Sequence, residues 1–299
     1  LMERNTAKRT LEKLLSVCIC LCMLGAMLPA QVFAEEADTA QTETVQDTAP
    51  KDTVHLSSAD DLIQLAKNCR LDSWSQNRTV VLEADVDLSS VDFNGIPSFG
   101  GTWEGQNHAI TGLSLSQDGS VQGLFRYVQQ GALVRDMTVK GRIKPGGTRA
   151  SVGGIAGSNA GTIENCAFDG VVSGTSQIGG IAGVNTVKGS INGCTVSGTV
   201  YGSHFVGGVV GQNDGVAANC TNVASVNTTV SQNEVKLNDL TLDNVLKTEK
   251  ANDVTDAGGI AGNNAGVLRA CINRGTIGYS HIGYNVGGIA GSQTGYVEG

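Results

Sequence analysis

Apolar residues alternate with glycine along the second half of this chain, and the arrangement repeats. The clearest marker is a Gly-Gly pair, and successive pairs begin 26, 28, 51 and 29 residues apart. The spacing of 51 residues equals about two periods, or one period with an insertion. A period of about 20 to 50 residues indicates a solenoid or an array. The pairs are Gly153 and Gly154, Gly179 and Gly180, Gly207 and Gly208, Gly258 and Gly259, and Gly287 and Gly288.

Each repeat places apolar residues at equivalent positions, which form columns when the repeats are aligned. No run between them has the 3.6-residue spacing of a helix, so we predict three short strands per repeat, joined by tight turns. The columns are Ile155, Ile181, Val209, Ile260 and Ile289; Ile163, Ile191, Ala217, Leu268 and Val297; Cys166, Cys194, Cys220 and Cys271; and Val172, Val200 and Ile277.

Glycine suits a chain that turns several times within one repeat, because such turns need positive φ angles or positions without a Cβ atom. Equivalent strands of successive coils must run parallel, and parallel crossovers are almost always right-handed. The sequence therefore predicts an all-β protein, a right-handed parallel β-helix.

An amide column adds a further feature to the repeats. It contains Asn159, Asn185, Asn213 and Asn264, with Gln293 in the last copy. Stacked amides can hydrogen-bond along a solenoid as a ladder. The alternative is that asparagine only tolerates the turn conformation.

Residues 55–121 are expected to form an N-terminal cap helix and the first β-helix coils, followed by solenoid repeats over 122–299. Ser57 or Ser58 precedes Asp60 and Asp61 in a capping-box arrangement, which predicts a short amphipathic helix that covers the end of the solenoid. In the following stretch, TVVLEADVDL, we expect the apolar positions beginning with Val81 to alternate with acids on a strand.

Residues 1–34 are typical of an export signal peptide. Four cations precede the apolar run LLSVCICLCMLGAML, and small residues lead to a cleavage site between Ala34 and Glu35. An uncleaved anchor is the alternative, although the run is shorter than the roughly 20 residues that span a bilayer. Residues 35–54 are acidic and rich in threonine, and are expected to form a disordered linker.

Charge limits the partners of the exported chain. Removing residues 1–34 takes away four cations and two acids, which leaves 16 Lys and Arg against 26 Asp and Glu, a formal charge of about −10. Nucleic acid and anionic membranes need clustered cations, so neither is expected as a partner. After signal removal, the protein is not expected to be integral to a membrane.

The motifs GGIAGSNAGTIENC, GGIAGVNTVKGSINGC and GGIAGNNAGVLRAC resemble the GLUG repeats of secreted and surface-attached bacterial proteins. GTWEGQNHAITGL is similar to the strand-turn-strand unit that often precedes them. The resemblance covers about residues 90–299 and implies a β-solenoid on a bacterial surface, often in adhesin-like proteins. Similar repeats also occur ahead of the catalytic domain of some immunoglobulin-cleaving metallopeptidases.

No catalytic or metal-binding motif is evident in the sequence. There is no H-E-x-x-H motif. His55, His108, His204 and His281 occupy non-equivalent places, so we interpret them as solvated turn residues. In the next three repeats no acid stands at the positions of Asp169 and Glu164, and such variation is typical of a solvent-facing column. The sequence predicts no catalytic, cofactor-binding or metal site.

The mature chain would keep five cysteines, and four of them share one column. Small buried hydrophobes are one interpretation of Cys166, Cys194, Cys220 and Cys271. The other is a disulfide between neighbours such as Cys194 and Cys220, which the parallel Cβ vectors of stacked coils oppose.

Residues 225–257 interrupt the repeat, because they contain no glycine before Gly258 and carry several leucines among charges. They are interpreted either as a loop and helix that protrude from the solenoid and bind a partner, or as a coil of degenerate sequence. The chain also begins Leu-Met and stops inside a repeat, so we expect it to be truncated at the C-terminus.

Two functions are compatible with these features. The first is a non-catalytic adhesin or structural stalk, secreted or attached to the bacterial cell surface, with a host glycan or surface protein as its partner. The second is the accessory repeat region of a larger secreted enzyme, a metallopeptidase or a polysaccharide-degrading protein, whose catalytic domain lies outside this chain.

Overall fold

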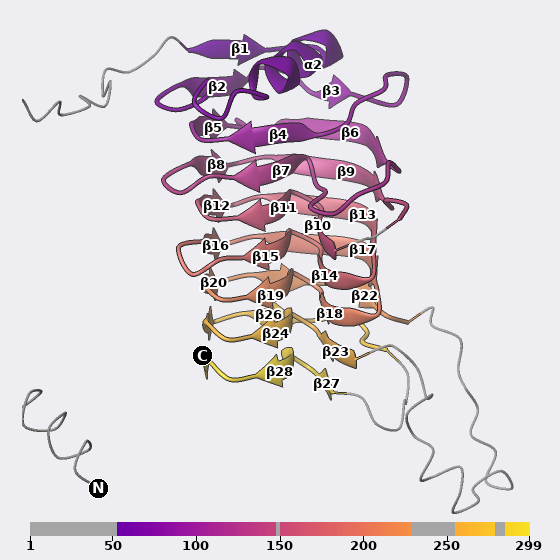
Figure 1. The fold of residues 1–299 in the computed structure, drawn as a ribbon. Coiled ribbons are helices and arrows are strands. Elements are labelled where there is room, and N and C mark those ends of the chain that lie inside the picture. The colour runs from indigo at the N-terminus through magenta and orange to yellow at the C-terminus, as the bar shows by residue number, and fades with distance from the viewer. Residues whose placement is uncertain (1–52, 148–149, 229–254, 279–284) are drawn as a thin grey trace, which may run out of the picture. The chain divides into compact units, whose positions relative to one another are not determined.

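The computed structural model describes residues 53–147, 150–228, 255–278 and 285–299, all within one compact unit, Thr48–Gly299. Their strands form four parallel sheets, and each sheet takes strands from successive coils (Figure 1). The chain is therefore a parallel β-solenoid, as predicted. The predicted signal peptide, with Ala34 and Glu35, and nearly all of the predicted linker lie outside the described residues.

Sheet A is the longest and runs from the first strand to the last. Its nine strands, in spatial order, are β1 (Val54–Leu56), β2 (Thr79–Leu82), β5 (Thr102–Glu104), β8 (Leu133–Arg135), β12 (Thr162–Glu164), β16 (Ser190–Asn192), β20 (Val216–Ala218), β25 (Val267–Arg269) and β29 (Tyr296–Glu298). The first strand begins at Val54, so the solenoid starts inside the predicted linker.

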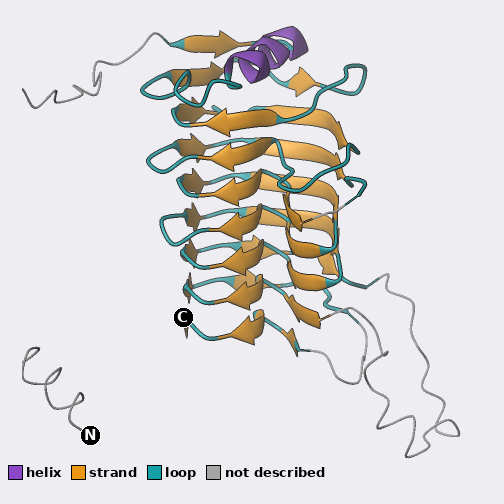
Figure 2. Ribbon diagram, in the orientation of Figure 1, coloured by secondary structure: helices purple, strands orange, loops and turns teal. Residues whose placement is uncertain are grey.

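Sheets B and C form two further sides of each coil (Figure 2). Sheet C contains β4 (Ile96–Phe99), β7 (Phe125–Val128), β11 (Ala156–Asn159), β15 (Ala182–Asn185), β19 (Val210–Asn213), β24 (Ala261–Asn264) and β28 (Ala290–Gln293). Sheet B contains β3 (Val86–Asp87), β6 (Ala109–Leu115), β9 (Thr138–Ile143), β13 (Ala167–Ser173), β17 (Thr195–Tyr201), β21 (Thr221–Asn222), β22 (Ser225–Val226) and β26 (Ile272–Asn273).

Sheet D is the feature that the sequence did not predict. It consists of β10 (Ala150–Gly153), β14 (Ser176–Gly179), β18 (His204–Gly207), β23 (Thr255–Gly258) and β27 (Val286–Gly287). The Gly-marked repeats therefore carry a fourth strand that ends at the first glycine of each pair, and the prediction of three strands was wrong for them. Each of the first four strands contains one residue with a positive φ angle of 52° to 59°, namely Ser151, Gln177, Phe205 and Asp256. These residues interrupt the alternation of inward and outward side chains by which a strand is recognised in a sequence.

The glycine pairs are explained by close approach rather than by unusual φ angles, since none of them is among the glycines with positive φ. A Cβ atom on Gly154 would lie 2.2 Å from the carbonyl oxygen of Gly180 and 2.4 Å from the ring of Phe168. On Gly180 it would lie 2.2 Å from Cγ1 of Val196. Because these glycines have no Cβ atom, the backbone of one coil can pack directly against the backbone and side chains of the next.

The helix α2 (Ala59–Asn68) lies at the N-terminal end and contacts β1 and β4, as the predicted cap would (Figure 1). Ser58 is its N-cap, and the Ser58 hydroxyl oxygen accepts a hydrogen bond from the Asp61 amide at 3.3 Å. Asp61 in turn accepts from the amide of Ser57, one residue before the N-cap, at 3.0 Å, so the arrangement is a variant of the predicted capping box. Leu62 and Leu65 are buried against the first coils.

The core is a continuous column of small aliphatic side chains inside the four sheets, with larger aromatics near the capped end. Phe99, Trp103 and Phe125 pack there with ring centroids 5.3 to 6.1 Å apart. In β2 the buried residues are Val80 and Leu82, so the expectation for Val81 was wrong by one residue, whereas Val86 and Leu88 further along the same stretch are buried. Such a shift exchanges the two faces of a strand.

The coils on either side of residues 229–254 are in direct contact. Strand β18 pairs with β23, with Gly207 opposite Gly258, and β19 pairs with β24. Since no coil lies between these paired strands, the spacing of 51 residues is one period with an insertion. A whole additional coil is excluded, and the choice between a protruding loop and a degenerate coil with a longer turn stays a prediction. Residues 225–226 and 255–258 belong to strands, and residues 229–254 lie outside the described part of the chain.

Candidate functional site

The asparagine column forms a hydrogen-bonded ladder in the interior. Nδ2 of Asn159 donates to Oδ1 of Asn185 at 2.8 Å, and Asn185 donates in the same way to Asn213 at 2.8 Å. Asn213 donates to Asn264 at 2.7 Å, and Asn264 donates to Oε1 of Gln293 at 2.9 Å. Because the four asparagines are essentially fully buried, this column is structural.

The cysteine column is also internal. Cys69, Cys166, Cys194 and Cys220 are buried, Cys271 is half-buried, and all five are free thiols. In the repeat column each thiol reaches a carbonyl of the preceding coil, for example from Cys166 to Val134 and from Cys194 to Ile163 at 3.7 to 3.8 Å. The alternative of a disulfide between Cys194 and Cys220 was therefore wrong.

Burial makes these thiols poor nucleophiles. Desolvation raises the pKa of Cys166 to about 12 and that of Cys69 to about 11. Hydrogen bonding with the Cys194 side chain, together with desolvation, raises the pKa of Cys220 to about 12. Reactive cysteines have lowered pKa values and partial exposure, so these are not candidates for catalysis.

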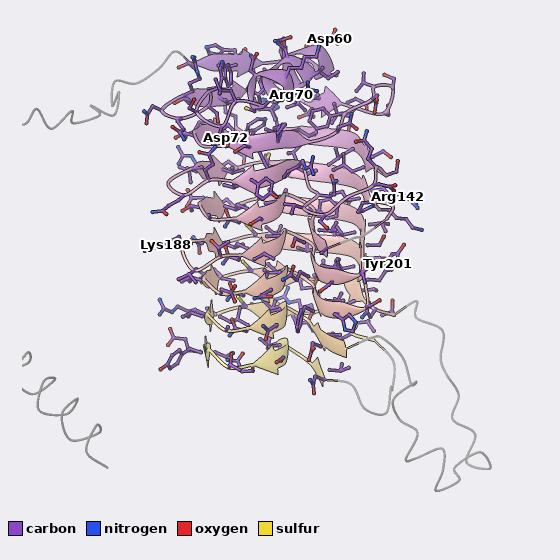
Figure 3. All side chains as sticks on the ribbon, in the orientation of Figure 1. Asp60, Arg70, Asp72, Arg142, Lys188 and Tyr201 are labelled. Carbon is purple, nitrogen blue, oxygen red and sulfur yellow. The ribbon has the colours of Figure 1, made fainter. Side chains whose placement is uncertain are left out.

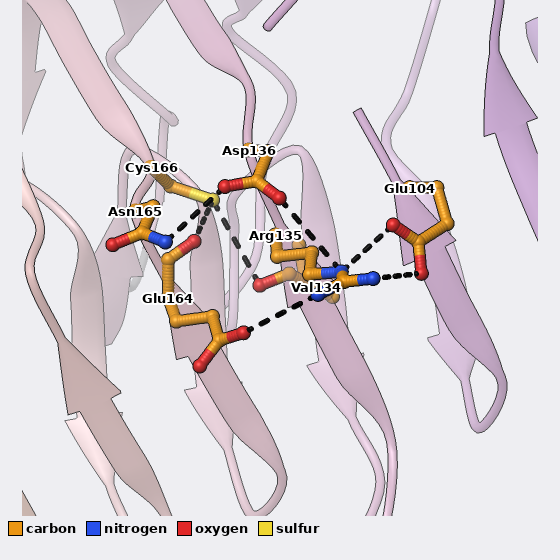
Figure 4. Close-up of polar contacts among 7 residues, drawn as sticks. All are labelled: Glu104, Val134, Arg135, Asp136, Glu164, Asn165 and Cys166. Atoms are coloured by element: carbon orange, nitrogen blue, oxygen red, sulfur yellow. Dashed lines mark hydrogen bonds and ion pairs between the residues drawn. The ribbon is translucent and has the colours of Figure 1, made fainter. Parts of the chain in front are cut away.

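The densest group of charges lies on the outer edge of sheet A (Figure 4). Arg135 donates two hydrogen bonds to Glu104 in the preceding coil, from Nε at 2.7 Å and from Nη2 at 2.8 Å. Asp136 and Glu164 lie 3.8 and 4.0 Å from the same guanidinium. The pKa of Arg135 is raised, chiefly by its hydrogen bonds with Glu104.

This cluster does not have the arrangement of a glycosidase carboxyl pair. Such a pair needs two carboxyl groups that converge on a substrate, whereas here the carboxylates converge on a guanidinium. Arg135 lies between Glu104 and Glu164 in the register of the sheet and holds the two carboxylates as ion pairs. The positions equivalent to Glu164 in the later coils are Asn192, Ala218, Arg269 and Glu298, and the ion pair found among them joins Arg269 to Glu298.

Two of the four histidines contact an acid from a neighbouring coil, which sequence spacing did not indicate. Nδ1 of His55 lies 2.6 Å from Oε1 of Glu83, and Nδ1 of His108 lies 3.1 Å from Oδ1 of Asp85. His281 lies outside the described residues. Within the described ranges, no three His, Cys, Asp or Glu side chains are grouped so that they could hold a metal ion.

A concavity lies on the outer face of sheet C, beside the turn that follows α2. Its volume is about 780 Å³, within the range of about 300 to 1,000 Å³ that is usual for small-ligand sites. We call it the Tyr127 groove. It is lined by Asp72, Gln76, Pro97, Ser98, Arg126, Tyr127, Val128, Gln129, Ser158 and Ala160.

Tyr127 is the prominent side chain of this groove. It is 47% exposed, although tyrosine carries a large apolar ring. Its register partners in the neighbouring coils are Ser98 and Ser158. Tyr127 is therefore the one large side chain between two small ones across these three coils.

The wall of the groove is fixed by hydrogen bonds rather than by loose side chains. Nε2 of Gln129 donates to the Asp72 carbonyl and to Oγ of Ser98, both at 2.7 Å. Its Oε1 accepts from Nε2 of Gln76 at 2.9 Å. These bonds tie the turn after α2 to sheet C, so the groove is formed before any ligand arrives. The sequence did not predict it because the residues that line it come from separate stretches of the chain.

No protein-family profile matches the chain, so the GLUG resemblance stays a prediction from the motifs. A segment covering 37% of the chain is 28% identical, over 128 residues, to Halomucin from Haloquadratum walsbyi, and it spans 1% of that protein. A crystal structure described as a candidate immunoglobulin A1 protease from Bacteroides ovatus is 17% identical. It covers 82% of this chain and 83% of its own, with a TM-score of 0.45. The fold assignment rests on the strand pairing described above.

Proposed function

We propose that this chain is a secreted, surface-associated β-solenoid that acts as a non-catalytic adhesin. The observation that carries the proposal is the preformed Tyr127 groove on an otherwise repetitive scaffold. Its exposed aromatic ring and fixed amide wall are features of a binding site rather than of a reaction site.

The rest of the molecule supports a scaffold role. The amide ladder and the thiol column lie in the interior and link successive coils. The charge cluster around Arg135 is held in ion pairs, as described above. These features stiffen the coil stack and present the groove, which is what an adhesin or a stalk requires.

Export is part of the same proposal. It rests on the cations and apolar run before Ala34 and on the resemblance of the motifs to GLUG repeats. In the described part of the chain, no helix is both long enough and apolar enough to cross a membrane. N-terminal sequencing of protein recovered from the culture medium or cell surface should begin at Glu35.

The second candidate is the accessory repeat region of a larger secreted enzyme, and the motif resemblance to metallopeptidase repeats favours it. In that role the same groove would hold a substrate for a catalytic domain elsewhere. The proposal for this chain is unchanged, namely binding without turnover.

The test is adhesion by the purified protein coupled to beads. We expect saturable attachment to immobilised mucin or cultured epithelial cells, competed by the free protein, and no release of peptide or sugar fragments. Attachment no greater than that of albumin-coated beads, or catalytic turnover by the chain alone, would contradict the function proposed.

A further inference from the structure

We propose that the Tyr127 groove binds a saccharide that carries an acidic group, an inference that rests on the adhesin function proposed above. The groove has a polar wall, an open aromatic ring and, at one end, a set of cations without carboxylate partners. The ligand class follows from these three features together.

The cations belong to a second concavity that joins the first. It has a volume of about 260 Å³ and shares Pro97 and Arg126 with the Tyr127 groove. It lies against the C-terminal end of α2, from which Lys67 and Arg70 line it. Figure 3 shows Arg70 and Asp72 at this end of the solenoid. A ligand on Tyr127 can therefore extend toward the cations without leaving the surface.

The charges of this combined surface differ from those of the chain as a whole, whose net charge is −8. Three cations, Lys67, Arg70 and Arg126, line it with two acids, Asp72 and Asp92. None of the ion pairs found among the described residues involves any of the three cations.

Arg126 is oriented without being neutralised. Its Nε donates to the Val121 carbonyl at 3.1 Å, and its Nη2 donates to the Ser120 carbonyl at 3.3 Å. Both acceptors are uncharged, so the guanidinium keeps its full charge where the two concavities meet. A positioned guanidinium binds carboxylate and sulfate groups well, because its donors match their paired oxygens.

The remaining groups suit the rest of a sugar. The apolar face of a pyranose ring packs on an exposed aromatic ring such as that of Tyr127. The Asp72 carboxylate and the Ser158 hydroxyl line the groove and can bond to sugar hydroxyls. A long polyanion is disfavoured, because the acidic chain repels it outside this surface. A short saccharide with one or a few acidic groups fits best.

Isothermal titration with three hexasaccharides tests the assignment: hyaluronan, which carries carboxylates, chondroitin sulfate, which also carries sulfates, and neutral chitohexaose. We expect at least one acidic probe to bind about tenfold or more tightly than the neutral one. A preference between the two acidic probes identifies which acidic group the cations recognise.

Two variants and two matched controls locate the site. Tyr127→Ser extends the serine column of sheet C and should lower affinity about tenfold or more, as loss of an aromatic anchor does. Arg70→Gln should lower affinity several-fold and weaken its dependence on salt. Tyr296→Ser and Lys188→Gln change exposed residues of later coils and should leave binding unchanged. Figure 3 shows Lys188 away from the capped end.

The assignment is overturned if no acidic hexasaccharide binds at millimolar concentration, if chitohexaose binds equally well, or if Tyr127→Ser binds like the parent. The bead assay separates this failure from failure of the proposed function. If beads that carry the parent and beads that carry Tyr127→Ser adhere equally well, adhesion depends on another surface of the protein. If beads that carry the parent do not adhere, the adhesin function itself is contradicted.

Discussion

Asn185 donates a hydrogen bond from its side-chain Nδ2 to Oδ1 of Asn213, one coil further along the solenoid, at 2.8 Å. The same Nδ2 group contacts the Gly189 carbonyl at 3.3 Å and the Val216 carbonyl at 3.1 Å. Each amide thus closes a turn within its own coil and fastens that turn to the next coil. The ladder interpretation of this column is therefore confirmed, whereas the alternative that asparagine only tolerates a turn conformation is wrong, because the four asparagines lie in strands and have no positive φ angle.

Replacing Asn185 with Ala should destabilise the protein by about 3 kcal/mol or more. The substitution leaves Oδ1 of Asn213 without its ladder donor and removes the bond from Asn185 to the Gly189 carbonyl, and each buried polar group left unpaired costs about 1 to 3 kcal/mol. Nδ2 of Asn159 loses its ladder acceptor and keeps the Gly161 and Ser190 carbonyls. Urea unfolding followed by circular dichroism measures the change. The control is Asn192→Ala, on the outer edge of sheet A, which loses one exposed contact with Asn219 and should cost less than about 1 kcal/mol. Equal losses would show that the inner ladder has no special role.

Ile181→Asp should prevent folding or cost about 4 kcal/mol or more. Ile181 is fully buried between Ile155 and Val209 of the neighbouring coils, so the new carboxylate would be buried without a partner. The matched variant is Thr195→Asp, at an exposed position of β17, and its melting temperature should stay close to that of the parent. Ser197 is a poorer control, because its hydroxyl donates to Asp169 and an Asp there would add repulsion. Identical melting temperatures for the Ile181 and Thr195 variants would refute the assigned faces.

Gly198→Ala should cost clearly more than Gly131→Ala. Both glycines have positive φ angles, +95° and +82°, so both substitutions strain the backbone by about 1 kcal/mol. At Gly198 the new Cβ would also lie 2.0 Å from the Gly170 carbonyl oxygen, whereas no atom lies within 4 Å at Gly131. Thermal unfolding of the two variants measures the difference, and a Gly198 variant as stable as the Gly131 variant would argue against the close stacking of sheet B.

The thiol column predicts a loss of stability in alkaline solution. The pKa of Cys166 and that of Cys220 are raised from 9.0 to about 12 in the folded chain. Between these two pH values the folded chain keeps thiol protons that the unfolded chain has released. Their contribution to stability is complete below about pH 9 and is lost as the pH rises from about 9 to 12. Urea unfolding across this range measures it, and the double variant Cys166→Ala and Cys220→Ala should show a flatter profile than the parent.

The same column predicts slow thiol labelling. Reaction of the folded protein with a maleimide at neutral pH should be slow, and unfolding in guanidinium should release five thiols per exported chain, since all five are free. Three or fewer after denaturation without reductant would mean that a disulfide exists.

The interior was largely predictable because its columns repeat. Five copies of one pattern identify which residues face inward, and Ile155, Ile163 and Cys166 are buried with most of their counterparts. At the N-terminal end there is no repeated copy to compare, and the inward residue of β2 is Val80 rather than Val81.

The Tyr127 groove was not predictable, because its parts come from separate stretches of sequence. Asp72 follows the cap helix, Ser98 lies in β4 and Gln129 follows β7, and only the stacking of coils brings them together.

Sheet D was not predicted, for a local reason. A positive φ angle at residues such as Gln177 breaks the alternation by which a short strand is recognised.

The central claim is that each Gly-Gly repeat is one coil that stacks directly on the next, including the two coils on either side of residues 229–254. It is tested most directly by through-hydrogen-bond scalar coupling in NMR of the deuterated protein. The account predicts a coupling between the amide nitrogen of Val209 and the carbonyl carbon of Ile260, whose N–O distance is 3.0 Å. It should match the coupling from Ile181 to Val209, where the distance is 2.8 Å. A coupling from Ile181 to Val209 without one from Val209 to Ile260 would contradict the account.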